Sequence, residues 1–272
     1  MQRISWLLLA ALLVMTAPIV ILFTWLIIDS FSVAAVNSIW PASFTLSHWD
    51  FLFATIEGHP SVWKASGNTL IFAISTVGVV VATAVTAGYA LSRLSFPFRA
   101  QLLAGTLMLH AFPSISLIVA IFLTLRFLGL YDTLIGVVLV KASLEIPLGI
   151  WVMKGFYDSV SWDIEMAGMV DGASRFWVWW RLILPQVGPG IAALAIFSFI
   201  ASWSEFILPL VLSPSSDVAL LSVYLAGLLN DDNFTDYGML KAVGLFYIFP
   251  VMMFYLLTQD RLMQVFGRAS QG

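Results

Sequence analysis

The 272-residue sequence contains no cysteine and few charged residues. Without cysteine, the chain has no disulfide framework, no thiol nucleophile and no cysteine-ligated zinc site. Lys, Arg, Asp and Glu make up 10% of the residues, against about 25% in ordinary soluble domains. The net charge is −3 and no block of basic residues is present, so nucleic acid is not expected as a partner.

Apolar residues are correspondingly abundant, at 61% of the chain with a mean hydropathy of +0.98. This composition excludes a soluble globular domain and a disordered chain. The apolar runs are long and continuous, whereas a transmembrane β-barrel needs alternating segments of about ten residues. The composition therefore predicts an all-α membrane protein.

Six apolar segments are long enough, or nearly so, to cross a bilayer as helices of about 20 residues. The first is interpreted as a retained signal anchor, because it exceeds the usual h-region of about 7–15 residues and no A-x-A-like site follows it. The six spans are expected near residues 6–28, 68–92, 102–125, 133–153, 189–211 and 241–259.

Lys and Arg are distributed unequally between the two sides that six spans define. Eight of the 12 lie on the side of the termini, three lie on the other side, and Lys141 lies within a span. The side richer in Lys and Arg is cytoplasmic, so both termini are expected in the cytoplasm. Residues 1–272 are then a single transmembrane domain whose longest cytoplasmic segment is 154–188.

This cytoplasmic segment predicts two short helices. Ser161 can cap a helix start, and Glu165 follows in the first turn, where the helix dipole favours negative charge. Gly172 suits the left-handed conformation past a helix end. Ser174 can cap a second helix, which Pro185 ends.

Four apolar residues of the first short helix are spaced to form one face. A hairpin with such a face fits an amphipathic element that lies on the bilayer, and equally an element that docks in a groove on a partner protein. The spacing does not separate these two interpretations. The four residues are Trp162, Met166, Met169 and Val170.

Charged residues also occur inside expected spans. Lys141 and Glu145 are four residues apart and share one face of the fourth span. A charge in hydrocarbon costs about 2.5–3.5 kcal/mol on insertion scales, and pairing lowers that cost. The pair is either structural or part of the polar lining of a substrate path.

Glu205 is a further internal acid, and the ring of Trp203 stands beside it. An aromatic ring next to hydrogen-bonding groups suits a sugar, whose C–H face packs on the ring. The alternative is an interfacial Trp with a solvated acid. The complete set of candidates for the substrate path is Lys141, Glu145, Ser143, Trp203, Glu205, His110 and Ser114.

The cytoplasmic segment resembles the EAA loop of ABC importer permeases, through Asp163-Ile-Glu-Met-Ala-Gly-Met-Val-Asp-Gly-Ala-Ser174 and Leu182-Ile-Leu-Pro185. Registered on Gly172, Met166 occupies the usual Glu position and Gly168 that of the second Ala. Glu165 matches the acid that is often doubled there in sugar-type permeases. The resemblance assigns nine residues to an ATPase-coupling loop: Glu165, Met166, Ala167, Gly168, Asp171, Gly172, Ala173, Leu184 and Pro185.

Other segments resemble carbohydrate-type, MalG-like permease subunits in the same order along the chain, and together they extend over about residues 60–260. These segments are Asn68-Thr-Leu, Gly88-Tyr-Ala-Leu-Ser-Arg-Leu-Ser-Phe-Pro97, Phe112-Pro113 with Leu128-Gly-Leu-Tyr-Asp-Thr133, and Trp203-Ser-Glu-Phe-Ile-Leu-Pro-Leu210.

The resemblance implies a type I ABC importer permease fold with six transmembrane helices in the cytoplasmic membrane. It implies four partners, namely a homologous second permease subunit, two ATPase subunits and an extracytoplasmic solute-binding protein. The chain lacks the Walker A pattern G-x-x-x-x-G-K-[ST]. ATP and Mg are therefore expected in the partner subunits, and no cofactor, metal or catalytic residue is expected on this chain.

The function that the resemblance implies is ATP-driven import of a sugar by alternating access, the sugar being a mono- or oligosaccharide or a related polyol or glycoside. The alternative is an ion-coupled secondary transporter of a small polar solute, which also uses intramembrane charges. That alternative leaves the EAA-like loop unexplained. An intramembrane hydrolase has no support, because neither H-E-x-x-H nor G-x-S-x-G occurs, and a purely structural scaffold explains the hydrophobicity alone.

Overall fold

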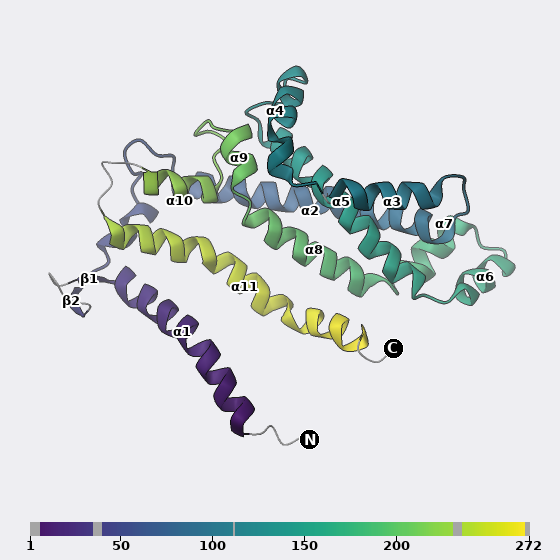
Figure 1. The fold of residues 1–272 in the computed structure, drawn as a ribbon, viewed down its shortest axis with the longest axis horizontal. Coiled ribbons are helices and arrows are strands. Elements are labelled where there is room, and N and C mark those ends of the chain that lie inside the picture. The colour runs from purple at the N-terminus through teal and green to yellow at the C-terminus, as the bar shows by residue number, and fades with distance from the viewer. Residues whose placement is uncertain (1–5, 35–39, 111, 231–235, 270–272) are drawn as a thin grey trace. The chain divides into compact units, whose positions relative to one another are not determined.

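The chain folds mainly into helices, as the long apolar runs predict (Figure 1). The computed structural model describes residues 6–34, 40–110, 112–230 and 236–269. The first half contains α1 (Trp6–Ser30), β1 (Ser32–Ala34), β2 (Pro41–Phe44), a 3₁₀ turn (Ser47–Leu52), α2 (Val62–Arg93), α3 (Arg99–His110), a second 3₁₀ turn (Ser114–Leu117) and α4 (Ile118–Phe127). The second half contains α5 (Leu134–Asp158), α6 (Trp162–Val170), α7 (Arg175–Val178), a π-helical turn (Trp179–Ile183), α8 (Gly188–Trp203), α9 (Ile207–Leu212), α10 (Leu221–Asn230) and α11 (Tyr237–Ala269).

Four of the described helices are long and apolar enough to cross a membrane, at Leu8–Ser30, Val62–Arg93, Leu134–Asp158 and Tyr237–Gln259. A fifth candidate is the pair Arg175–Ile183 and Gly188–Trp203, whose two parts are bent by 75°. Length and hydropathy therefore give four or five candidate spans in the described part of the chain, compared with the six expected.

The segment expected to form a span near 102–125 is not one continuous helix. Helix α3 ends at His110, and the 3₁₀ turn Ser114–Leu117 precedes α4. Pro113 explains the break, because proline has no backbone N–H and its ring clashes with the carbonyl four residues earlier in a helix. Pro113 itself is extended, with φ −61° and ψ 123°.

The expected helix over 189–211 is also interrupted. Helix α8 ends at Trp203 and α9 begins at Ile207. In a continuous helix, Pro209 would meet the carbonyl of Glu205 without being able to donate a hydrogen bond to it. The chain turns at 204–206 instead.

The chain divides into two compact units, the first formed by residues 1–63 and 224–250. Within this unit, Ser32 pairs with Phe44 and Val33 pairs with Ser43 in an antiparallel two-stranded sheet, which the all-α prediction did not include. The ring of Trp49 stacks on Phe31 with centroids 5.1 Å apart. These contacts join described parts of the segment that follows α1.

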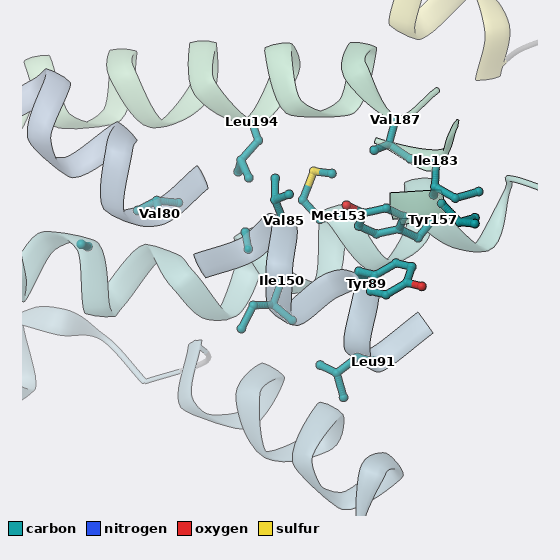
Figure 2. Packing of buried hydrophobic residues seen from close by; sticks show 13 residues of the cluster. Val80, Val85, Tyr89, Leu91, Ile150, Met153, Tyr157, Ile183, Val187 and Leu194 are labelled. Carbon is teal, nitrogen blue, oxygen red and sulfur yellow. The ribbon is translucent and has the colours of Figure 1, made fainter. Parts of the chain in front are cut away.

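The second unit comprises residues 64–223 and 251–272, and contains the larger core. Side chains from α2, α5, the π-helical turn and α8 pack together there, as Figure 2 shows. Tyr89 and Tyr157 meet edge to face, with ring centroids 5.6 Å apart. Met153 and Tyr157 are fully buried.

Small residues let α2 and α5 approach each other closely in this core. A Cβ atom on Gly88 would lie 2.8 Å from the Cβ of Met153 and 3.1 Å from the backbone nitrogen of Lys154. On α5, a Cβ on Gly149 would lie 3.2 Å from the Cβ of Ala84. Close packing through small residues is a common way for helices to associate inside a membrane.

This packing predicts that Gly88→Val destabilises the second unit, because the added side chain forces α2 and α5 apart. Overpacking of this kind costs about 1–3 kcal/mol. The check is the thermal unfolding midpoint of the detergent-solubilised protein. Gly78→Val is the matched control on the same helix, since a Cβ on Gly78 has no atom within 4 Å among the described residues. Equal midpoints for the two variants would contradict the close-packing argument.

Candidate functional site

The first candidate site is the segment between α5 and α8, residues 159–187, which we call the loop hairpin. The Ser161 hydroxyl accepts a hydrogen bond from Asp163 N at 3.2 Å. Gly172 follows the first helix with φ +87°, and the Ser174 hydroxyl accepts from Trp177 N at 3.3 Å. The predicted caps and turn of the two short helices are thus confirmed.

The apolar face expected on α6 is largely exposed in the isolated chain, as both expected roles, lying on the bilayer or docking in a partner, require. Of the four residues expected to form its packing face, Trp162, Met166 and Val170 are 44%, 49% and 83% exposed, and Met169 is half-buried. The fully buried position is Glu165, at 0% exposure. The apolar pattern of α6 therefore marks mainly an outward face.

Gly168 is the reason that α6 can lie so close to the second half of the loop hairpin. A Cβ atom at this position would lie 2.9 Å from Val178 Cγ2 and 3.0 Å from Leu182 Cδ1. In the EAA register this position is normally Ala. The glycine therefore gives α6 a closer approach than alanine would allow.

Glu165 is held by side chains of α2. Its Oε1 accepts a hydrogen bond from the Tyr89 hydroxyl at 2.8 Å, and its Oε2 lies 3.4 Å from Arg93 Nε. Arg175, at the start of α7 and 48% exposed in its side chain, lies 3.9 Å from Oε1. The one buried acid of the loop hairpin thus binds within its own chain.

The second half of the loop hairpin presents aromatic side chains outward. Phe176, Trp177 and Trp180 are 70%, 49% and 55% exposed. Trp179 instead turns inward and donates a hydrogen bond to the Tyr157 hydroxyl at 3.2 Å. Of the other candidate coupling residues, the exposed ones are Ala167, Asp171, Gly172 and Pro185, and the half-buried ones are Ala173 and Leu184.

The second candidate site is a set of three mostly buried charges, Lys141, Glu145 and Glu205, which we call the charged triad. Lys141 Nζ lies 3.2 Å from Glu145 Oε1 and 2.7 Å from Glu205 Oε2. The side chains are 12%, 18% and 16% exposed. The predicted i,i+4 pair is present, and Glu205 joins it from the turn between α8 and α9.

Glu205 also satisfies the backbone at the helix break. Its Oε1 accepts from the backbone nitrogens of Phe206 and Leu208, at 3.2 and 3.3 Å. Its own carbonyl accepts from the Ser222 hydroxyl at 2.6 Å. One residue therefore balances the lysine charge and caps the start of α9.

The remaining candidates for the substrate path do not join the triad. Ser143 is exposed and donates to Val140 O of its own helix. Trp203 is 4% exposed and packs against Phe199, so its ring face is not open to a ligand. Ser114 lies exposed in the second 3₁₀ turn, and the side chain of His110 lies outside the described residues. The residue that the candidate set lacked is Ser198, which donates to Glu145 Oε2.

Near the N-terminal end of α2, two polar side chains hold the segment that precedes α10. Asn68 Nδ2 donates to the carbonyls of Asp217 and Ala219, at 3.0 and 3.1 Å. The Thr69 hydroxyl accepts from Leu221 N at 2.8 Å. A hydrogen bond from Lys64 lowers the pKa of the Asp217 carboxyl below its usual value. Asn68 and Thr69 therefore hold residues 217–221 against α2 through three hydrogen bonds.

Comparison with known proteins identifies a family that this sequence matches. The model described as "Binding-protein-dependent transport system inner membrane component" matches residues 74–268. The diacetylchitobiose uptake system permease protein NgcG of Streptomyces coelicolor is 29% identical, over 96% of this chain and 86% of its own length. The trehalose transport system permease protein SugB of Mycobacterium tuberculosis is 30% identical, over 72% of each chain.

Solved structures share the fold. A chain of a bacterial ABC transporter that imports the acidic polysaccharide alginate superposes with a TM-score of 0.80 at 22% identity, covering 95% of this chain and 96% of that one. A second structure, an alginate ABC transporter in complex with an alginate pentasaccharide-bound periplasmic protein, gives a TM-score of 0.73 at 16% identity, covering 96% and 95%.

The geometry of the triad predicts a large effect of Lys141→Met, because the substitution leaves two mostly buried carboxylates without their cation. Breaking a buried pair in this way costs about 3–5 kcal/mol. The check is the unfolding midpoint in detergent. Lys64→Met is the control, because it breaks an exposed pair with Asp217 and such pairs contribute about 0–1 kcal/mol. A midpoint for Lys141→Met equal to that of the control would show that the triad does not stabilise the fold.

Proposed function

The chain belongs to the family of binding-protein-dependent transport system inner membrane components, and from this membership we propose that its cargo is a mono- or oligosaccharide or a related polyol or glycoside. Two relatives already described are named for diacetylchitobiose and trehalose. A third, the permease protein MalD of Streptococcus pneumoniae, is named for maltodextrin. This agreement among relatives carries the proposal of a sugar.

The chain is a permease subunit of an ABC importer, located in the cytoplasmic membrane as a multi-pass protein. Its family is a family of transport-system components, and we propose that this chain itself catalyses no reaction. Membership in this family supports an ABC importer and not the alternative of an ion-coupled secondary transporter.

The proposed topology has six crossings, with both termini in the cytoplasm. The third crossing would use α3, the second 3₁₀ turn and α4, and the fifth would use α8 and α9. Helices broken in this way are tolerated in membranes where the freed backbone groups find partners within the protein, as those of Phe206 and Leu208 do at Glu205. The excess of Lys and Arg on the side of the termini supports the orientation.

We propose that the chain works with a second, homologous permease, two ATPase subunits and an external solute-binding protein. ATP and Mg would be bound by the ATPase subunits, and this chain would hold no cofactor. The absence of a Walker A pattern from the sequence supports that division.

The loop hairpin is the element proposed to dock in an ATPase subunit. It is anchored to its own chain through Glu165 and Gly168, and it leaves Met166, Val170 and Phe176 exposed. An apolar helical face of this kind fits a groove on a partner. This pairing of a buried anchor with an exposed apolar face is the observation that carries the coupling role.

The charged triad is proposed to line the substrate path in at least one state of the cycle. Its side chains are mostly but not completely buried, and they join α5 to the break between α8 and α9. In alternating access, ATP binding and closure of the ATPases must favour the outward state through contacts that differ between the two states. Rearrangement of the triad would supply one such difference.

The coupling role predicts that Gly172→Pro uncouples ATP hydrolysis from transport. Proline fixes φ near −65°, whereas Gly172 has φ +87°, so the turn between α6 and α7 cannot form. The measurement is sugar uptake per ATP hydrolysed, in proteoliposomes that contain the complex purified from its native operon. Gly172→Asn is the control and should retain coupling, because Asn tolerates the left-handed conformation.

The same preparation tests the importer assignment. We expect a Walker-A ATPase and a second permease to co-purify with the wild-type chain, and uptake to require ATP. Normal ATP-driven uptake by Gly172→Pro would contradict the coupling role. Uptake by the isolated chain without ATP would contradict the importer assignment itself.

The path proposal predicts that Glu145→Gln impairs uptake while the complex still hydrolyses ATP. The amide keeps the size of the side chain but removes the charge that faces Lys141. The initial uptake rate and the ATPase rate are measured on the same preparation. Glu57→Gln, at an exposed acid, is the control. Unchanged uptake by Glu145→Gln would assign the triad to structure alone.

A further inference from the structure

Two buried opposite charges lie where the loop hairpin meets the rest of the second unit. Arg93, the last residue of α2, is 5% exposed, and Glu165 of α6 is 0% exposed. Their Nε and Oε2 atoms are 3.4 Å apart. Burying two charges costs several kcal/mol per ion unless their geometry and hydrogen bonds compensate. Other contacts of Arg93 and Glu165 must therefore offset the cost of burying their charges.

Arg93 joins three segments at this point. Its Nη2 donates to the carbonyls of Tyr157 and Val160, at 2.8 and 2.5 Å, so its charge is placed at the C-terminal end of α5. A cation is favoured there because the helix dipole is negative at that end. The guanidinium carbon also lies 4.9 Å from the ring centroid of Trp162, at the start of α6.

Glu165 provides the contacts on the α6 side of this ion pair, which together with those of Arg93 we call the charged connection. Its hydrogen bond from Tyr89 links α6 to α2 one turn before Arg93. The Tyr89 ring packs against Tyr157 and Trp179, with centroid distances of 5.6 and 5.8 Å, and Figure 2 shows Tyr89 beside Tyr157 in the core. The carboxylate is thus attached to the buried hydrophobic cluster that contains Tyr89 and Tyr157.

The connection is also incompletely satisfied. Within the described residues, Arg93 Nε and Glu165 Oε2 are buried and have no hydrogen-bond partner. The two atoms face each other at 3.4 Å as an ion pair, which is a longer contact than the hydrogen bonds that Arg93 and Glu165 make to the other segments.

We infer that Arg93 and Glu165 are positioning residues that transmit displacement of α6 to the cytoplasmic ends of α2 and α5. Hydrogen bonds are directional, whereas hydrophobic contact is not. The hydrogen bond from Tyr89 to Glu165, together with the ion pair to Arg93, therefore fixes the position of α6 along α2, which packing alone would not do. The inference rests on the proposed coupling role of the loop hairpin.

The first test is Glu165→Gln, measured as sugar uptake per ATP hydrolysed in proteoliposomes containing the assembled complex. We expect the complex to assemble and this ratio to fall about tenfold, within the usual range of coupling between two sites. Asp163→Asn is the matched control, since it removes an exposed carboxylate from the same helix and should keep the wild-type ratio.

A second variant separates positioning from stability. Replacing a buried ion pair by apolar residues is often neutral or stabilising for the fold. Glu165→Gln leaves the buried charge of Arg93 unpaired and should lower the unfolding midpoint. The double variant Arg93→Met, Glu165→Met should regain that midpoint, while its uptake per ATP stays low.

Two results would overturn the inference: a wild-type ratio for Glu165→Gln in an assembled complex, or a wild-type ratio for the double variant. Either result would leave the proposed function intact, because Gly172→Pro tests that separately. Failure of the wild-type complex to assemble or to require ATP would instead refute the proposed function.

Discussion

The structure depends on one constraint, which is that a backbone inside a membrane must find its hydrogen-bond partners within the protein. A continuous helix without proline meets this constraint by itself, and α2 does so over 32 residues. The break between α8 and α9 does not, because Pro209 cannot continue the helical ladder. Glu205 meets the requirement there by accepting from two backbone nitrogens. A charged residue in an apolar segment is thus explained first by the break that it caps.

The cost of burying the Glu205 carboxylate at the helix break explains why Lys141 and Glu145 lie beside it. A carboxylate at Glu205 needs a cation in the same low-dielectric surroundings, and Lys141 provides it from α5. Lys141 in turn lies beside Glu145, which also accepts from Ser198. In a chain with 10% charged residues, these charges therefore form one connected group that ties α5 to the end of α8. Any movement that opens this region must exchange or break the same contacts.

Local features of the sequence predicted local features of the structure well. An uninterrupted apolar run predicted α2, and an apolar segment interrupted only by Lys141 and Glu145 predicted α5. The i,i+4 spacing of these two residues predicted their contact. Caps and a glycine predicted the turn of the loop hairpin. Long-range contacts were not predictable in this way. No local pattern indicates that Glu205 reaches Lys141, 64 residues away, or that Glu165 is buried against Arg93. Periodicity identified the apolar face of α6, but not whether the bilayer or a partner protein covers that face.

The two departures of the loop from the EAA pattern have one physical explanation. Gly168 lets α6 lie against Val178 and Leu182, and this close approach places Glu165 inward against Arg93 and Tyr89. The adjacent position, Met166, must then point outward, where it is 49% exposed. Replacement of the usual Glu by Met at this position consequently leaves the buried connection intact and removes a charge only from the outer face. If that face meets an ATPase subunit, the contact has to rest on apolar packing, and the acid that positions the helix is the one that the partner never touches.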